Sequence, residues 1–148
     1  MAKQYRSDEI VVTFEPRLCI HSAHCIKGLP EVFDVLKKPW IQPDKAIADR
    51  IAEVVQRCPT GALHYQRLDG GAEESVPSAM TIEVRPKGPL FVRGSIVIKG
   101  SDGQVIRQDT RMALCRCGHS GNKPFCDGTH KSVQFDSASI PSGKEESR

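Results

Sequence analysis

The chain has 148 residues, of which 39% are apolar, 26% charged and 5% aromatic, so it can bury the core of one domain or of two small ones. Large catalytic barrels and multidomain machines are excluded. Lys and Arg (21) nearly balance Asp and Glu (18), which leaves a net charge of +3. No basic run exceeds two residues, so the basic surface of a nucleic-acid-binding protein is missing.

The six cysteines are the most informative part of the composition. The amino terminus has no apolar segment beyond the short run Ile10 to Val12, so we expect no signal peptide, no membrane span and a cytoplasmic location. Structural disulfides rarely persist in that reducing compartment. Metal binding is therefore the favoured role of the thiols, and disulfides are the alternative if the protein is exported.

Residues 1–68 are expected to form a first domain with the order β-loop-α-β. Ile10 to Phe14 is rich in β-branched and aromatic residues and predicts a strand, with residues 62–67 as its partner. Between them, a helix is predicted after its N-cap Asp44, and it should stop at Cys58. The apolar face of this helix should consist of Ile47, Ile51, Val54 and Val55.

Three cysteines of this domain match part of a ferredoxin motif. Bacterial ferredoxins bind a cluster through Cys-x2-Cys-x2-Cys-x3-Cys-Pro. Cys19 and Cys25 take the first and third positions, Ser22 stands in the second, and Leu29-Pro30 replaces the last Cys-Pro. Cys58-Pro59 supplies the distant cysteine that would complete a single site. Three incidental cysteines are the alternative, because this spacing is only moderately specific.

On these residues, and on residues 28–33, 39–41 and 58–63, the segment 5–67 resembles the divergent single-cluster ferredoxin domains. The resemblance implies a [3Fe-4S] or [4Fe-4S] cluster that transfers electrons. Three cysteines satisfy a [3Fe-4S] cluster, whereas a [4Fe-4S] cluster needs a fourth ligand. That ligand could be His21, Ser22, His24 or solvent, and the sequence leaves the choice open.

Two segments have no sign of a folded core. Residues 69–78 are rich in Gly, Ser and acidic residues and have no periodic apolar face, so we expect a linker there. Residues 141–148 are small and charged, and we expect them to form a flexible tail. The second domain is thereby placed at residues 79–140.

This second domain is expected to be rich in β-structure. Met80, Ile82 and Val84 alternate with polar residues and predict a first strand. Leu90 to Ile98 predicts a second strand, with a bulge or close packing at Gly94, and the Asp102-Gly103 turn leads into a third. With the first domain, this makes an α+β protein: a ferredoxin-like β-loop-α-β domain followed by a small β-rich domain.

Three thiols and one imidazole fall within residues 115–130. Cys115 and Cys117, two residues apart, can reach one metal from the end of an extended strand. Cys126 and His130, four apart, would share one face of a helical turn that Asp127 can cap. Tetrahedral zinc would also accept this ligand set, but the Cys-x-Cys spacing is better suited to one iron of a cluster.

The segment resembles the CDGSH iron-sulfur family, which includes the mitoNEET-type proteins, through Cys-x-Cys, Ser120, Pro124 and the run from Cys126 to His130. The resemblance covers about residues 79–135. It implies a [2Fe-2S] cluster with Cys115 and Cys117 on the inner iron and Cys126 and His130 on the outer one. It also implies a homodimer, unless the first half of the chain covers the same surface.

The chain has no nucleophile-base pair, phosphate-binding glycine loop or nicotinamide motif, so we expect a non-catalytic protein. Two clusters favour electron transfer between redox partner proteins, a reductase and an acceptor. The alternative is cluster transfer, or redox and pH sensing, by the cluster that His130 binds. A released imidazole takes a proton near its usual pKa of about 6.5, so mild acid should loosen that cluster. A zinc-bound interaction domain is the third hypothesis.

Overall fold

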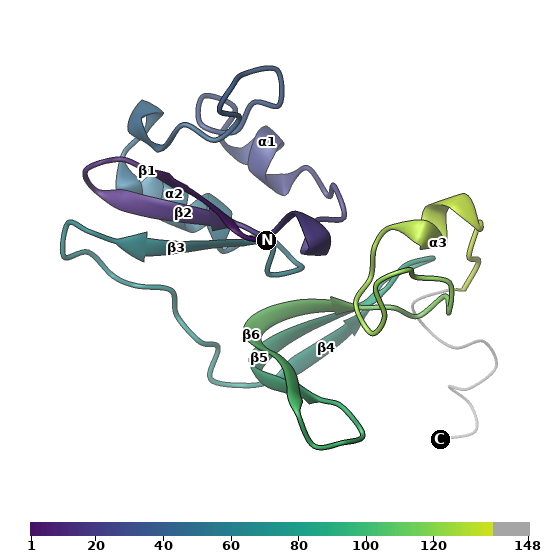
Figure 1. Ribbon diagram of the computed structural model, residues 1–148. Helices are drawn as coiled ribbons and strands as arrows, with labels where there is room; N and C mark the ends of the chain where they lie inside the picture. Colours follow the sequence, from purple (N-terminus) through teal and green to yellow (C-terminus); the bar gives the residue numbers. More distant parts are fainter. Residues whose placement is uncertain (138–148) are drawn as a thin grey trace, which may run out of the picture. The chain divides into compact units, whose positions relative to one another are not determined.

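The chain divides into two compact units, Met1–Val76 and the residues from Pro77 onward, in a computed structural model that describes residues 1–137 (Figure 1). Each unit contains a three-stranded antiparallel sheet and short helices. Two domains with mixed helix and strand are therefore confirmed. The predicted tail, residues 141–148, lies outside the described residues. No helix within residues 1–137 has the length and apolar character needed to cross a bilayer.

The first unit is built on a sheet in the order β1-β2-β3. The central strand β2 (Ile10–Phe14) pairs with β1 (Lys3–Arg6) on one side and with β3 (Leu63–Arg67) on the other. Ile10 lies opposite Arg67 and Phe14 opposite Leu63, which confirms the predicted pairing. β1 was not expected, because its side chains are mostly exposed and show no apolar alternation.

The helix α2 (Ala48–Val55) contacts β3 through an apolar face. Ile51, Val54 and Val55 are buried as predicted. Two details of the expected helix are wrong. It begins at Ala48 and not after Asp44, because Asp44 belongs to a separate 3-10 turn, η2 (Pro43–Lys45), and extended backbone at Ala46 interrupts the helical path. Ile47 is the N-cap residue, and at 61% exposure it lies outside the buried face.

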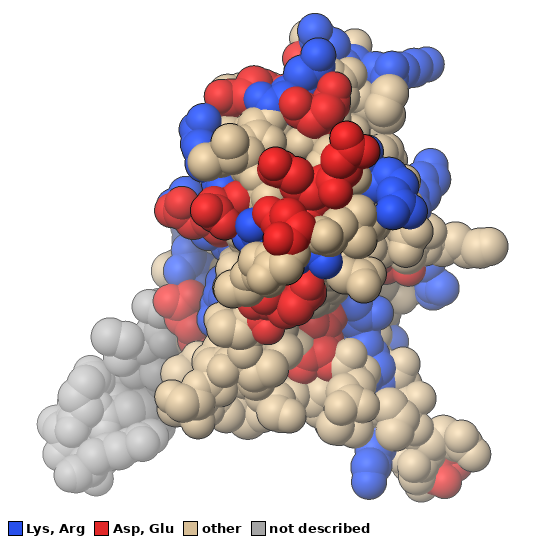
Figure 2. Space-filling view, turned by 90° about the vertical axis from the view of Figure 1, so that its left-hand side faces the viewer, with Lys and Arg blue, Asp and Glu red and all other residues tan. Residues whose placement is uncertain are grey.

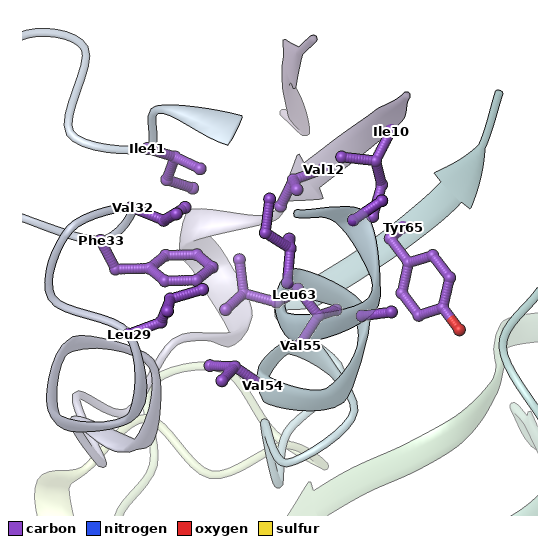
Figure 3. Packing of buried hydrophobic residues seen from close by; sticks show 13 residues of the cluster. Ile10, Val12, Leu29, Val32, Phe33, Ile41, Val54, Val55, Leu63 and Tyr65 are labelled. Carbon is purple, nitrogen blue, oxygen red and sulfur yellow. The ribbon is translucent and has the colours of Figure 1, made fainter. Parts of the chain in front are cut away.

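One core joins the sheet, α2 and the loop that follows the first cysteines (Figure 3). Ile10 and Leu63 enter it from the sheet, Ile51 from α2, and Phe33 and Ile41 from the loop; each is at most 2% exposed. Full burial of such side chains stabilises the fold by about 1.5–3 kcal/mol each. These buried side chains hold the loop in place. The short helix η1 (Pro16–Leu18) ends directly before Cys19, and the short helix α1 (His24–Gly28) contains Cys25.

The segment after β3 returns along that strand. Glu74 accepts hydrogen bonds from the backbone N–H of Tyr65 and from His64 Nδ1, both at 2.7 Å, and Glu73 accepts one from the N–H of Arg67 at 2.8 Å. These carboxylates satisfy backbone donors at the edge of the sheet that lacks a partner strand. Residues 73 and 74, within the expected linker, are thereby attached to the first unit.

The second unit has the three strands that the sequence predicts: β4 (Thr81–Val84), β5 (Leu90–Lys99) and β6 (Val105–Leu114). They form an antiparallel sheet in this order. The register shifts after Arg93, which confirms the irregularity expected at Gly94. Gly94 has φ +139°, and a Cβ there would lie 3.0 Å from Met80 Cα, so only glycine fits. β6 ends directly before Cys115, and α3 (Thr129–Ser132) follows Cys126.

Charged side chains of both signs share the surface of the described residues. Figure 2 shows Asp and Glu side chains interspersed with Lys and Arg on one face. Arg67, for example, lies between Asp69 at 2.7 Å and Asp49 at 2.9 Å. This arrangement agrees with the small net charge of the chain.

Candidate metal centres

The end of β6 places two thiols at one point. Cys115 and Cys117 follow the strand directly, and their Sγ atoms are 3.9 Å apart. Two thiolates on one tetrahedral metal, each bound at about 2.3 Å, are separated by about 3.8 Å. The two thiols therefore have the spacing of ligands to a single metal ion.

Cys126 and His130 form a second pair. Sγ of Cys126 and Nδ1 of His130 are 3.4 Å apart, close to the separation of about 3.6 Å expected for sulfur and nitrogen on one tetrahedral metal. Both side chains are buried, at 3% and 9% exposure. Gly128, at φ +88°, turns the chain between them and is the N-cap residue of α3. Of the two ring nitrogens of His130, Nδ1 is therefore the one that faces the sulfur of Cys126.

Asp127 fixes the turn that carries this second pair. Its carboxylate accepts the backbone N–H of Thr129 at 3.0 Å and of Gly121 at 2.8 Å. Hydrogen bonds from Thr129 and Gly121 lower the pKa of Asp127 to about 2. Asp127 is therefore not the N-cap residue of α3, which is Gly128, but its carboxylate binds the N–H of the first helical residue, Thr129. The same carboxylate also holds the loop that leads from the first pair to the second.

The surroundings of the Cys115 and Cys126 thiols shift their pKa values. Burial raises the pKa of Cys126, and negative charge on Asp127, Cys115 and Cys117 raises it further. Burial also acts to raise the pKa of Cys115, but backbone N–H groups, those of Ser120 and Gly118 first, lower it overall. Thiolates are the form that binds metal, so a bound cation favours deprotonation of the whole group.

The four donors do not surround one common point. Within residues 1–137, no three His, Cys, Asp or Glu side chains converge closely enough to hold one ion. The Cys115–Cys117 and Cys126–His130 pairs are each spaced for a metal of their own. This arrangement suits two metal ions, one per pair, better than one zinc ion, which needs all four ligands within its tetrahedron.

Arg116, between the first two thiols, anchors the loop from outside. Its guanidinium donates to the backbone oxygens of Arg85 at 2.7 Å and Gly88 at 2.9 Å, and to Ser137 Oγ at 3.0 Å. It also lies 4.9 Å from the ring centre of Phe135. Sequence reasoning missed this role, because the hydrogen-bond partners lie 21 to 31 residues away and carry no motif.

In the first unit, Cys19, Cys25 and Cys58 line one cavity of about 550 Å³. Cys19 follows η1, Cys25 lies in α1, and Cys58 lies shortly after α2. All three are half-buried. The sequence-distant thiols are thus gathered at one site, whose remaining walls are mostly apolar and include Phe14 and Trp40.

The loop between Cys19 and Cys25 is held in an uncommon conformation. His21 and Ala23 have φ values of 59° and 66°, a region that residues other than glycine rarely adopt. The N–H of His21 lies 3.4 Å from Cys19 Sγ. Left-handed residues in such loops turn successive N–H groups toward a bound anion, as at many iron-sulfur sites.

The same site disfavours free thiolates. Burial raises the pKa of Cys19, and burial followed by the negative charge of Cys58 raises the pKa of Cys25 to about 11. Thiols of this kind remain protonated at neutral pH until a cationic group enters. The donors therefore fit a metal cluster, which supplies that positive charge.

Comparison with known proteins gives each unit a matching family model. Residues 5–68 match the family model described as a divergent 4Fe-4S mono-cluster, and residues 87–131 match the one described as an iron-binding zinc finger of CDGSH type. Proteins named "Uncharacterized protein YjdI" in Escherichia coli strains K12 and O157:H7 are 37% identical to this chain over 62 residues. Those residues are 42% of this chain and 82% of each relative. Both resemblances seen in the sequence are confirmed, and the chain belongs to the divergent 4Fe-4S mono-cluster family, with a CDGSH-type iron-binding domain fused behind it.

Proposed function

We propose that the protein holds two iron-sulfur clusters and passes single electrons between redox partner proteins, a reductase and an acceptor. The observation that carries the proposal is the grouping of donors: three thiols around one cavity in the first unit, and two metal-spaced pairs in the second. Bound clusters would supply one-electron redox chemistry. The protein's own contribution is to bind them, shield them and present them to partners.

A [2Fe-2S] cluster suits the second unit. Cys115 and Cys117 would hold one iron, and Cys126 with His130 Nδ1 the other. Buried Cys126 and His130 would be shielded from water, whereas Cys115 and Cys117 are half-buried. Replacing one thiolate by a neutral imidazole removes a negative charge from the ligand set, which favours the reduced state.

A [4Fe-4S] cluster is proposed for the first unit, with Cys19, Cys25 and Cys58 as its thiolate ligands. The cavity they share supports a cluster, and the match to the 4Fe-4S mono-cluster family supports this choice over [3Fe-4S]. His21 and His24, at the same cavity, are exposed, so the cluster would lie near the surface. Electron exchange between proteins requires such an accessible edge.

The test begins with anaerobically purified full-length protein. Iron and acid-labile sulfide analysis should give both clusters, and potentiometric titration should show both cycling reversibly. A flavin-dependent ferredoxin reductase should then reduce the protein, which should pass each electron to cytochrome c. Cys25→Ser and Cys126→Ser variants are the controls, because each should remove the contribution of one unit.

Two outcomes would overturn the proposal. A colourless protein with zinc and no sulfide would show a zinc domain. A protein that gives its cluster to an apo-ferredoxin faster than it passes electrons would show cluster transfer instead. The burial of His130 argues against easy release, because this ligand must leave before the second cluster can.

A further inference from the structure

Three cysteines leave one iron of a four-iron cluster without a thiolate. We propose that the hydroxyl oxygen of Ser22 is the fourth ligand of the N-terminal cluster and that His24 holds it in position. This inference rests on the [4Fe-4S] cluster of the proposed function and names the residue that completes its site.

Ser22 has the right place in the loop. It lies three residues from Cys19 and three from Cys25, it is half-buried, and its side chain lines the same cavity as the three thiols. The residues on both sides of it, His21 and Ala23, have left-handed backbone conformations. The loop that wraps the cluster position is therefore bent on either side of this serine.

His24 holds the serine hydroxyl. Its Nδ1 lies 2.9 Å from Ser22 Oγ, a normal hydrogen-bond distance. When Nδ1 accepts the hydroxyl proton in this bond, the lone pairs of Oγ are left for a metal. One of them forms the iron–oxygen bond, the O–H proton stays in the hydrogen bond to Nδ1, and no electron is transferred.

The other candidates are each placed beside a cysteine ligand. His21 Nδ1 lies 3.9 Å from Cys19 Sγ, beside a thiol that is already a ligand. Thr60 Oγ1 is similarly close to Cys58 Sγ, at 3.6 Å. In a four-iron cluster each iron takes one protein ligand, so these groups are placed to hydrogen bond to a sulfur that is already a ligand.

His24 itself is less suited to be the ligand. Its side chain is exposed, and its Nδ1 is engaged with Ser22. Solvent would be the ligand only if no side chain reached the fourth iron. Ser22 is the side-chain oxygen at this cavity that lies in the chain between the two loop cysteines, and it takes part in neither the His21–Cys19 nor the Thr60–Cys58 contact.

The experiment compares the full-length wild type with Ser22→Ala, Ser22→Cys and His21→Ala variants, all reconstituted anaerobically with iron and sulfide. Iron is counted per chain, and oxidised samples are studied by electron paramagnetic resonance and Mössbauer spectroscopy. Oxidised two-iron and four-iron clusters are diamagnetic, whereas an oxidised three-iron cluster is paramagnetic. The oxidised C-terminal cluster therefore gives no electron paramagnetic resonance signal that could hide a three-iron signal.

We expect the wild type to be silent in the oxidised state, with one iron distinct from the other three in the Mössbauer spectrum. Ser22→Ala should lose one iron per chain and gain the three-iron signal. Ser22→Cys should keep the fourth iron and make it less distinct, since a thiolate then completes the set. His21→Ala should resemble the wild type.

Three results would overturn the assignment. A Ser22→Ala protein that keeps its fourth iron and its spectra would exclude the serine as a ligand. A histidine nitrogen strongly coupled to the reduced wild-type cluster, detected by pulsed electron paramagnetic resonance and absent in His21→Ala, would assign that ligand to His21. A wild type without any N-terminal cluster would overturn the proposed function as well, whereas the first two results leave it standing.

Discussion

The side chain of Arg116 should control how long the C-terminal cluster survives. The residue lies between Cys115 and Cys117, and its guanidinium connects their loop to the turn at Arg85 and Gly88 and to Ser137. Replacement by alanine removes these charge-assisted hydrogen bonds and the contact with the Phe135 ring. The thiols themselves remain, so the change loosens their support without removing a ligand.

The size of the effect follows from the number of contacts and from solvent access. A hydrogen bond to a charged group contributes about 1.5–3 kcal/mol when buried. Arg116 is only partly buried, so water replaces much of each lost bond, and we expect Arg116→Ala to cost about 2 kcal/mol in total. If the cluster is lost from the opened loop, this corresponds to roughly thirtyfold faster loss.

Decay of the visible absorbance after addition of an iron chelator measures the rate. Lys123→Ala is the matched control, because it removes a positive charge from the same loop, where the lysine side chain is exposed. Arg116→Lys keeps the charge but not the planar fork of donors, and should recover only a small part of the lifetime. Equal decay of Arg116→Ala and wild type would refute the reasoning, and equally fast decay of Lys123→Ala would show that charge alone matters.

Three other predictions concern the fold and the pH response. Phe33→Ala should lower the free energy of unfolding of the first unit by about 3–5 kcal/mol in urea titrations, whereas exposed Val35→Ala should change it by less than about 0.5 kcal/mol. The hydrogen bond from Arg67 lowers the pKa of Asp69 from 3.8 to about 2, so its stabilising effect is full above pH 3.8 and is lost as the pH falls through about 2. Asp69→Asn should therefore reduce stability at neutral pH and weaken its dependence on pH in this acid range, and an unchanged acid profile would contradict the role of this ion pair. Burial lowers the pKa of His130, so proton-driven loss of the C-terminal cluster should set in below the usual histidine pKa, and His130→Cys should slow that loss in acidic buffer as followed by visible absorbance.

The elements that the sequence predicted are those with an apolar pattern. β2, β3, β5 and β6 bury alternate or consecutive apolar side chains, and α2 buries a helical face. β4 has the alternating apolar pattern in its sequence, but none of its side chains is fully buried. β1 and α1 lack such a pattern, since α1 has no buried residue and β1 has only one half-buried side chain. Their positions depend on pairing with β2 and on the cysteine loop, which are tertiary effects that local sequence does not encode.

The spacing of Cys and His in the sequence reveals the candidate ligands, but it does not reveal the contacts that hold those ligands in place. Cys115, Cys117, Cys126 and His130 lie within a short segment, so a motif reveals them. The contacts that hold this segment in place are long-range or involve the backbone. Arg116, for example, hydrogen bonds to residues that lie far before it and far after it in the sequence. The pairing of Ser22 with His24 is local, yet it depends on left-handed backbone conformations that these residue types do not predict.

Three thiols share one local arrangement, although they belong to two unrelated folds. The backbone N–H groups of His21, His119 and Gly128 each lie 3.4 Å from the sulfur of the cysteine two positions earlier. The donor is a backbone N–H group, so the residue at that position can be histidine or glycine. The residue type therefore does not predict the contact. A hydrogen bond to sulfur stabilises negative charge on it, and that charge is largest when a bound cluster is reduced. With clusters bound, both units would therefore favour the reduced state by the same local contact, which depends on how the chain turns after each cysteine and not on the sheet that carries it.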